Sequence, residues 1–178
     1  MNPGRRKRPA GGRTVWQPAA ARARDLILAA ILERNPIPIA YRVNYLANFY
    51  VGPLVKDLEK SFGMSRPEWI VLFCLQQQEG LNAQQISHVT GRPKTSISAA
   101  IKLLQKKNLI SRETDVQDGR RQVLQVTDAG QRVYARILEK FVVRETQMVS
   151  CLSAREREAF LALLQKMLEN SRDWAKDY

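Results

Sequence analysis

One stretch of the chain, residues 81–130, concentrates side chains that can hydrogen-bond to nucleic acid. Its members are three hydroxylated residues at the start of an expected helix and two arginines in a later expected turn: Thr95, Ser96, Ser98, Arg120 and Arg121. Hydroxyl groups exchange hydrogen bonds with phosphates and base edges, and a guanidinium group pairs with a phosphate through two parallel hydrogen bonds. DNA binding is therefore the first hypothesis that these residue types support.

Two expected helices, 82–90 and 93–107, position the hydroxyl groups. In the second helix, Ile97, Ile101 and Leu104 recur at spacings of four and three, which predicts an inward apolar stripe. The residues off that stripe face largely outward: Lys94, Thr95, Ser96, Ser98, Ala99 and Lys102. Two short helices with this division of faces are typical of a helix-turn-helix.

A two-stranded ribbon over residues 109–127 is expected to follow the second helix. Leu124 and Val126 alternate with Gln125, which is the period of a half-buried strand. The tip of the ribbon is expected at residues 117–121, where the two arginines lie. The stretch therefore predicts a helix-turn-helix with a wing.

The outward residues of the second helix divide by chemistry. Ser96 and Ser98 can bond phosphates or base edges, and Ala99 can contact the methyl group of a thymine. Lys94 and Lys102 are expected to hold phosphates, which position a protein on DNA without specifying sequence. In the wing, Arg120 is expected to enter a narrow minor groove, where the negative potential is enhanced.

Charge is concentrated in two places. The 178-residue chain has a formal net charge of +12, of which residues 1–34 contribute +6 and residues 82–127 contribute +5. Residues 35–81 and 128–178 are almost neutral. A basic surface kept only for solubility would be spread more evenly, so a polyanionic partner is favoured.

The other expected helices cover residues 19–34, 39–62, 66–78, 128–150 and 153 to about 174. Capping boxes are predicted at three helix starts: Ser65 with Glu68, Asn82 with Gln85, and Ser153 with Glu156. In the short helix 82–90, Ile86 and Val89 are expected to face inward. The last helix carries an apolar stripe, Phe160, Leu163, Leu164, Met167 and Leu168. Such a stripe must pack against something, and a partner subunit is the favoured candidate.

The long helix 39–62 suggests a ligand site. Polar and aromatic residues gather there and, in the helix 66–78, two further rings are expected opposite them: Tyr41, Arg42, Asn44, Tyr45, Asn48, Trp69 and Phe73. Aromatic walls with a few amides, phenols and an arginine suit a small aromatic carboxylate. The alternative is that the same residues are dimer contacts or satisfied core residues.

Several classes of protein are disfavoured. Cys74 and Cys151 are too far apart to suggest a disulfide framework or a zinc site, and a reducing cytoplasm fits them. The apolar run at residues 26–32 is too short for a signal peptide or a membrane span. His88 is the single histidine, and no base, nucleophile or metal partner lies at useful spacing. No enzyme activity, cofactor or metal site is expected.

The order of elements and several motifs resemble the MarR family of winged helix-turn-helix transcriptional regulators over about residues 37–172. The motifs that carry this resemblance are Trp69, the run 104–110, Arg112, Asp118-x-Arg120 in the wing, and the wing exit Val126-Thr127-x-x-Gly130. Three features depart from the family pattern: Asn108 replaces a usual glycine, Val126 replaces leucine, and the N-terminus is longer and more basic.

The resemblance implies a mainly α fold with a small antiparallel β-wing. The expected domains are a disordered basic tail (1–18), N-terminal dimerisation helices (19–62), the winged helix-turn-helix (63–130) and C-terminal dimerisation helices (131–178).

The resemblance also implies a homodimer that binds a pseudo-palindromic operator in double-stranded DNA, most often as a repressor. Arg112, Asp118 and Arg121 join the residues expected at DNA, with Asp118 orienting Arg120. Family members commonly place an effector pocket between the dimer helices and the DNA-binding domain. Aromatic or nicotinate derivatives fit that class.

Three alternatives remain at this point. The basic tail favours a nonspecific architectural DNA-binding protein. Cys74, in the apolar run 70–75, allows a redox-sensing regulator, although a buried thiol is usually inert. A winged helix can also serve as a protein–protein adaptor, which the charge on the wing disfavours.

Overall fold

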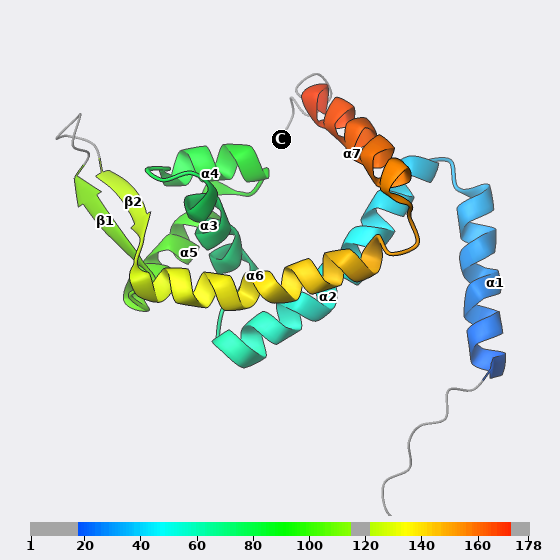
Figure 1. Cartoon of the computed structure of the whole chain (residues 1–178), viewed down its shortest axis with the longest axis horizontal. Helices are drawn as coiled ribbons and strands as arrows, with labels where there is room; N and C mark the ends of the chain where they lie inside the picture. The colour runs from blue at the N-terminus through cyan, green and yellow to red at the C-terminus, as the bar shows by residue number, and fades with distance from the viewer. Residues whose placement is uncertain (1–17, 115–121, 172–178) are drawn as a thin grey trace, which may run out of the picture. The chain divides into compact units, whose positions relative to one another are not determined.

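Proline and capping residues set the helix boundaries in the computed structural model, which describes residues 18–114 and 122–171. The elements in chain order are α1 (Pro18–Arg34), α2 (Pro38–Phe62), α3 (Arg66–Gln77), α4 (Ala83–Thr90), α5 (Lys94–Lys106), β1 (Ile110–Thr114), β2 (Gln122–Val126), α6 (Asp128–Met148) and α7 (Ala154–Glu169) (Figure 1). The predicted fold class, mainly α with a small antiparallel wing, is confirmed. The predicted disordered tail lies almost entirely outside the described residues.

All three predicted capping boxes are present at the starts of α3, α4 and α7. In the first, the Glu68 backbone N–H donates to Ser65 Oγ at 3.5 Å, and the Ser65 backbone N–H donates to Glu68 Oε2 at 2.8 Å. Each box satisfies backbone donors that a helix start leaves without an intrahelical partner. These local signals explain why the observed helix starts lie within about one residue of the predicted ones.

The chain divides into two compact units, Met1–Ala47 and Asn48–Tyr178. In the first unit, the described elements are α1 and the first turns of α2. The second unit contains the remainder of α2 and all later elements. Within it, we call α3, α4, α5, β1 and β2 the head. The boundaries predicted for the individual domains stay predictions.

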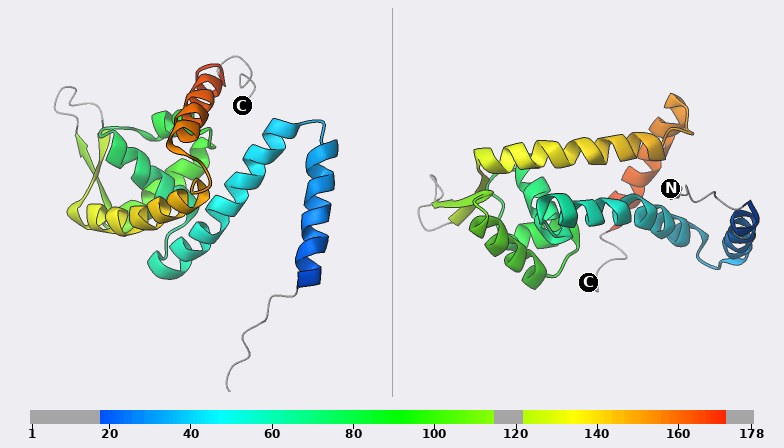
Figure 2. Two further views of the ribbon diagram at one scale, coloured as in Figure 1. Left: turned by 45° about the vertical axis from the view of Figure 1, so that its right-hand side comes forward. Right: turned by 90° about the horizontal axis from the view of Figure 1, so that it is seen from below.

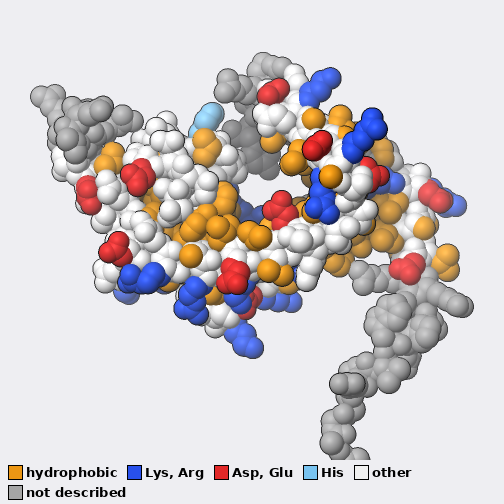
Figure 3. Space-filling model, viewed as in Figure 1, with side chains coloured by type: hydrophobic (Ala, Val, Ile, Leu, Met, Phe, Trp, Pro, Cys, Tyr) orange, Lys and Arg blue, Asp and Glu red, His pale blue; other side chains and the backbone are white. Residues whose placement is uncertain are grey.

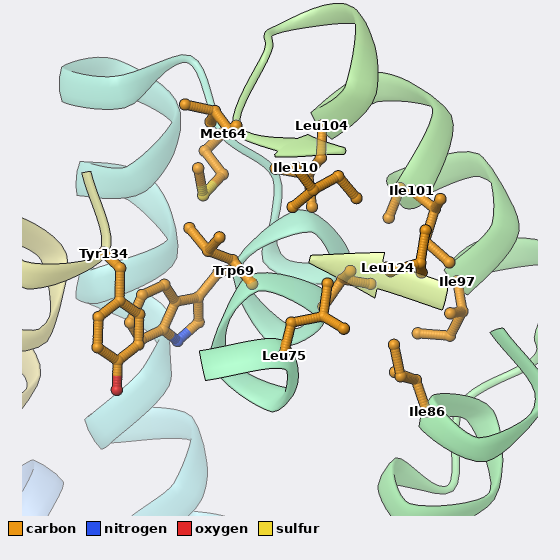
Figure 4. Close-up of a cluster of buried hydrophobic side chains, with 14 of the residues drawn as sticks. Met64, Trp69, Leu75, Ile86, Ile97, Ile101, Leu104, Ile110, Leu124 and Tyr134 are labelled. Atoms are coloured by element: carbon orange, nitrogen blue, oxygen red, sulfur yellow. The ribbon is translucent and has the colours of Figure 1, made fainter. Parts of the chain in front are cut away.

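The core of the second unit lies inside the head. Large apolar side chains from every head element, and one tyrosine from α6, meet there: Trp69, Leu75, Ile86, Ile97, Ile101, Leu104, Ile110, Leu124 and Tyr134 (Figure 4). The predicted stripe of Ile97, Ile101 and Leu104 is buried, and these three side chains fasten α5 to the core. Burial of this area is the main stabilising contribution to such a unit.

The two strands form an antiparallel ribbon in which Ile110 pairs with Val126 and Arg112 pairs with Leu124. Asn108, just before β1, has a φ of 56°. Asparagine tolerates this left-handed conformation better than most residues, which explains how it can replace glycine after α5. Views from two further directions show α6 starting at the base of the ribbon (Figure 2).

One prediction about α4 was wrong. Ile86 is fully buried, whereas Val89 is 65% exposed. Three helical positions correspond to about 300° of rotation, so residues at that spacing share a face only when the buried face is broad. The eight-residue α4 has a narrow buried face, which Ile86 occupies.

Over residues 18–114 and 122–171, no helix combines the length and the apolar character needed to cross a membrane.

Candidate nucleic-acid interface

Helix α5 has one buried face and one polar face. Ile97, Ala100, Ile101 and Leu104 are buried against the rest of the head. The residues predicted to contact DNA are on the remaining surface, where Lys94, Thr95, Ala99 and Lys102 are exposed and Ser96 and Ser98 are half-buried. The packing therefore holds α5 rigidly while leaving the hydroxyl and ammonium groups accessible.

The sequence interpretation missed two further exposed residues on α5. Leu103 and Lys106 are on the outer surface with Ala99 and Lys102. Each lies four positions after one of those predicted contacts, so the i, i+4 rule could have found them. Lys106 extends the positive charge of the outer surface toward the end of the helix.

The turn between α4 and α5 is held by backbone and hydroxyl hydrogen bonds. The Ser87 hydroxyl donates to the Arg92 carbonyl at 2.6 Å, and the Arg92 N–H donates to the Ser87 carbonyl at 3.3 Å. Gly91 ends α4 in the left-handed conformation with a φ of 61°. Burial lowers the pKa of the Arg92 guanidinium, and the neighbouring charge of Arg66 lowers it further. An anion close to both arginines would relieve their repulsion.

The wing presents one described candidate, Arg112, which is exposed on β1. The other predicted wing residues, Asp118, Arg120 and Arg121, lie outside the described residues. The antiparallel pairing of β1 with β2 places Thr114 opposite Gln122, the described residues on either side of the segment 115–121. Their roles at DNA stay predictions.

An ion pair braces the end of α5 against the start of α3. Lys107 Nζ lies 2.6 Å from Glu68 Oε1 and also donates to the Gly63 carbonyl at 2.6 Å. Burial alone would raise the pKa of Glu68, but hydrogen bonds from Lys107 and Ser65 outweigh it and hold that pKa below its ordinary value. Glu68 therefore stays ionised, and it both caps α3 and anchors α5.

The wing exit is closely packed. The Thr127 backbone N–H donates to the Leu109 carbonyl at 3.1 Å, and the Thr127 hydroxyl donates to the Asn108 carbonyl at 2.8 Å. A Cβ on Gly130 would lie 2.1 Å from the Leu109 oxygen and 2.8 Å from a methyl carbon of Val126. Only glycine fits here, which gives a physical reason for the glycine of the wing-exit motif.

Part of the predicted ligand set lies in the first unit. The rings of Tyr41 and Tyr45 stack with centroids 6.5 Å apart. Arg42 donates to the Pro38 carbonyl at 3.0 Å and to the Leu32 carbonyl at 3.4 Å, so its guanidinium joins the end of α1 to the start of α2. Asn44 is exposed in the same unit.

The rest of the predicted ligand set, Asn48, Trp69 and Phe73, lies in the second unit. Trp69 is 5% exposed, and its ring stacks on Tyr134 at 5.5 Å and on Phe141 at 4.8 Å. Phe73, by contrast, is 40% exposed beside Trp69. Much of the Trp69 surface is therefore already used by the core. The sequence interpretation missed Tyr134 and Phe141, because helical periodicity does not show which distant rings meet.

The first unit also contains an open hollow of about 630 Å³ where α1 turns into α2. Its lining is mainly aliphatic: Ile27, Ala30, Ile31, Arg34, Asn35, Pro36 and Ile37. None of the residues predicted to bind a ligand belongs to this lining.

The thiol of Cys74 is half-buried, and burial raises its pKa. Because the thiolate is the reactive form, this environment disfavours peroxide sensing. Within the described ranges, no three His, Cys, Asp or Glu side chains are grouped so that they could hold a metal ion.

Comparison with known proteins agrees with this geometry. A family model described as the MarR family matches residues 62–121, which are most of the head. Among curated relatives, the Escherichia coli transcriptional regulator HosA is 23% identical over 105 residues, covering 59% of this chain and 78% of HosA.

Solved structures give broader coverage. The crystal structure of a MarR-family transcriptional regulator from Silicibacter pomeroyi is 30% identical, with a TM-score of 0.69, and covers 80% of this chain and 94% of that one. The S. aureus MepR–DNA complex is 28% identical, with a TM-score of 0.66, and covers 76% of this chain and 98% of MepR. Sequence identity and fold agree, and the chain belongs to the MarR family of winged-helix, DNA-binding transcriptional regulators.

Proposed function

We propose that this regulator is a repressor that binds a pseudo-palindromic operator as a homodimer and is released by a small aromatic carboxylate. The observation that carries the DNA-binding part is the division of α5 into a fully buried stripe and an outer surface of hydroxyl and ammonium groups. A helix held in this way fits the major groove, where base edges can be distinguished. The related MepR, solved as a complex with DNA, supports the same use of the fold.

Within the proposed interface, the outer residues of α5 have separate roles. Thr95, Ser96, Ser98 and Ala99 meet base edges and phosphates near the start of the helix. Lys94, Lys102, Arg112, Arg120 and Arg121 supply phosphate and minor-groove contacts, and Asp118 orients the guanidinium of Arg120. Phosphate contacts strengthen binding to any sequence, whereas base contacts discriminate between sequences.

The exposed apolar surface of α7 supports the proposed homodimer. No described side chain of this helix is buried, and its exposed residues include Leu161, Leu163 and Leu168. A second copy would remove this surface from water and place two heads on one duplex. Heads on half-sites about 34 Å apart contact successive turns of the same side of B-DNA.

Competition binding tests sequence-specific recognition. The full chain is titrated with a duplex from its own promoter region, in the presence of either the same duplex or a scrambled one of equal length. A specific repressor is displaced at least a hundredfold more effectively by the promoter duplex, in line with specificity ratios of about 10³ or more. Equal displacement by both duplexes would instead establish an architectural protein. A Ser98→Ala variant should lose discrimination more than it loses affinity for scrambled DNA.

The effector proposal begins with the polar and aromatic residues of the first unit. Tyr41, Arg42, Asn44 and Tyr45 supply rings and hydrogen-bond donors there. Asn48, Trp69 and Phe73, which belong to the second unit, stay predicted ligand contacts. A carboxylate ligand would pair with Arg42, and its ring would stack on a tyrosine. To lower DNA affinity a hundredfold, the ligand must favour the non-binding conformation by about 2.7 kcal/mol.

A panel of hydroxybenzoates, cinnamates and pyridine carboxylates tests the effector. Each compound is added to the preformed promoter complex, and release is followed by fluorescence anisotropy in wild type and in Tyr45→Phe and Arg42→Met variants. Release of wild type alone supports the proposed residues. If the Arg42→Met variant is released from DNA at the same effector concentration as wild type, Arg42 does not bind the carboxylate. Release by peroxide, abolished by Cys74→Ser, would establish redox sensing in place of an aromatic effector.

A further inference from the structure

Helix α2 contains a proline in its interior, at position 53. In an α-helix, the N–H of residue i donates to the carbonyl of residue i−4, so residue 53 would donate to the carbonyl of Phe49. Proline has no N–H, and its ring also crowds that carbonyl. The Phe49 oxygen therefore needs a hydrogen-bond donor from outside the helix or from water.

Arg144 of α6 is that outside donor. Its Nη2 donates to the Phe49 carbonyl, and its Nε donates to the next carbonyl, Tyr50, at 2.7 Å. The planar guanidinium presents its N–H groups as a rigid fork, which matches two successive carbonyl oxygens. Ninety-five positions of sequence separate Arg144 from Phe49, so the fold itself brings donor and acceptor together.

Other contacts hold the same two helix segments. The Tyr50 hydroxyl donates to the Phe141 carbonyl at 3.4 Å, and the two rings meet edge to face with centroids 6.0 Å apart. Further along α2, Asp57 pairs with Lys140 at 2.6 Å. All of these residues belong to the second unit. This unit begins at Asn48, the residue directly before the two carbonyls that Arg144 binds.

We propose that Arg144 is a positioning residue that supplies α2 with the hydrogen-bond donor that Pro53 lacks, and that it thereby holds the part of α2 that begins at Asn48 in place against α6. The effect on DNA rests on the proposed function. If α2 and α6 lie near the surface that joins two copies, the contact between these two helices helps to set the separation of the two heads. A different explanation is that Arg144 only complements the negative end of the α6 dipole.

A double-mutant cycle separates the two explanations. The variants are Arg144→Met, Pro53→Ala and the double substitution, and the measurement is urea unfolding of the full chain. With Pro53 present, Arg144→Met is expected to lower the ratio of folded to unfolded protein about tenfold, since charge-assisted hydrogen bonds to two carbonyls are lost. In the Pro53→Ala background the alanine N–H can serve Phe49, so the same change should cost about threefold or less.

Two further variants control for charge and side-chain size. Arg132→Met removes an exposed arginine from the same helix, twelve positions earlier, and should cost the same with and without Pro53→Ala. Arg144→Lys keeps the charge but offers a point donor, so it should recover part of the loss caused by Arg144→Met. Equal costs of Arg144→Met in both backgrounds would overturn the proposal and support the dipole explanation.

The positioning effect has its own measurement. Wild type and Arg144→Met are titrated with duplexes in which the half-sites are at native spacing or separated by one or two additional base pairs, and with a single half-site. We expect the preference for native spacing to fall about fivefold or more, while affinity for the single half-site is unchanged. An unchanged spacing preference would overturn the positioning role. If wild type binds no DNA specifically, the proposed function fails, and the unfolding cycle still decides the donor role.

Discussion

The head buries its large apolar side chains, whereas the terminal helices α1 and α7 expose many of theirs. In the head, apolar side chains from five elements close on one another and are buried. In α7 no described residue is buried, and α1 exposes Leu26, Ile27 and Ile31. The space-filling view shows hydrophobic side chains exposed on α7 (Figure 3).

This difference supports the proposal that a second copy covers the apolar surfaces of the terminal helices. Each square ångström of apolar surface kept in contact with water forgoes about 25 cal/mol of stabilisation, so a helix with an exposed apolar stripe favours a partner. In the proposed homodimer, the terminal helices would supply the association surface and the head would supply recognition. Substitutions in the two regions should then have separable effects on folding, association and DNA binding.

The largest effect is expected at the wing exit of the head. Gly130→Ala places a methyl group against the Leu109 carbonyl, where the backbone cannot yield cheaply, and should lower the free energy of unfolding by about 4 kcal/mol. Urea unfolding measures the change. Gly52→Ala is the matched control, since a Cβ there meets nothing within 4 Å, and it should be neutral or stabilising. Equal stability of the two variants would show that the head tolerates movement at this point.

A smaller effect is expected from charging the terminal helix. Leu168→Glu would place a carboxylate in the proposed association surface and should raise the dimer dissociation constant about a hundredfold, or about 2.7 kcal/mol. Sedimentation equilibrium measures the constant, and circular dichroism confirms folding. Val89→Glu is the control, because both side chains are 65% exposed in the single chain. A similar weakening by both substitutions would remove the distinction between the two regions.

The capping boxes at Ser65 in the head and at Ser153 in α7 allow the stability of the two regions to be compared as a function of pH. Glu68→Gln, in the head, should cost about 2 kcal/mol near neutral pH, because Glu68 also pairs with Lys107. The folded-state pKa of Glu68 lies below its ordinary value of 4.5, so this contribution is complete above pH 4.5 and is lost as pH falls through the folded-state pKa. Unfolding curves of wild type and variant should therefore converge in acid. Glu156→Gln, in the exposed box of α7, should have the smaller effect near neutral pH.

The smallest effect concerns phosphate contacts. Lys102→Gln on α5 should weaken binding to specific and scrambled DNA alike, and should reduce the slope of log affinity against log salt by about 0.9. Lys166→Gln on α7 removes the same charge from a terminal helix and should leave the slope unchanged. Fluorescence anisotropy at several salt concentrations measures both. If Lys102→Gln and wild type show the same slope of log affinity against log salt, Lys102 does not contact a phosphate.

Local features of the fold were predictable from the sequence because their causes lie within a few residues. Capping boxes need partners three positions apart, and the inward stripe of α5 needs only its own periodicity. Asn108, which replaces a usual glycine of the family, has the left-handed conformation that asparagine tolerates. The outward surface of α5, where six of the proposed DNA contacts lie, was predictable for the same reason.

Contacts between distant segments were not predictable. Lys107 meets Glu68 across 39 positions, and Arg144 reaches the carbonyls of α2 across more than 90. Periodicity shows which side chains turn inward, but it does not show which partner they meet. The rings of Tyr134 and Phe141, which stack on Trp69, could for this reason not be predicted. The role of Trp69 in a ligand site stays a prediction. The prediction that Val89 faces inward was wrong for a related reason, since the width of the buried face of α4 depends on the helices that pack against it.

The Leu109 carbonyl is a point of close contact between the base of the ribbon and the start of α6. Its oxygen accepts the Thr127 N–H just before α6 and lies against Gly130 in the first turn of that helix. The packing at this contact leaves no free space, because a methyl group added to Gly130 would collide with the Leu109 oxygen. We therefore expect a small rotation of α6 to turn the base of the ribbon with it. The displacement would then increase along β1 and β2, so α6 could change the position of these strands at DNA.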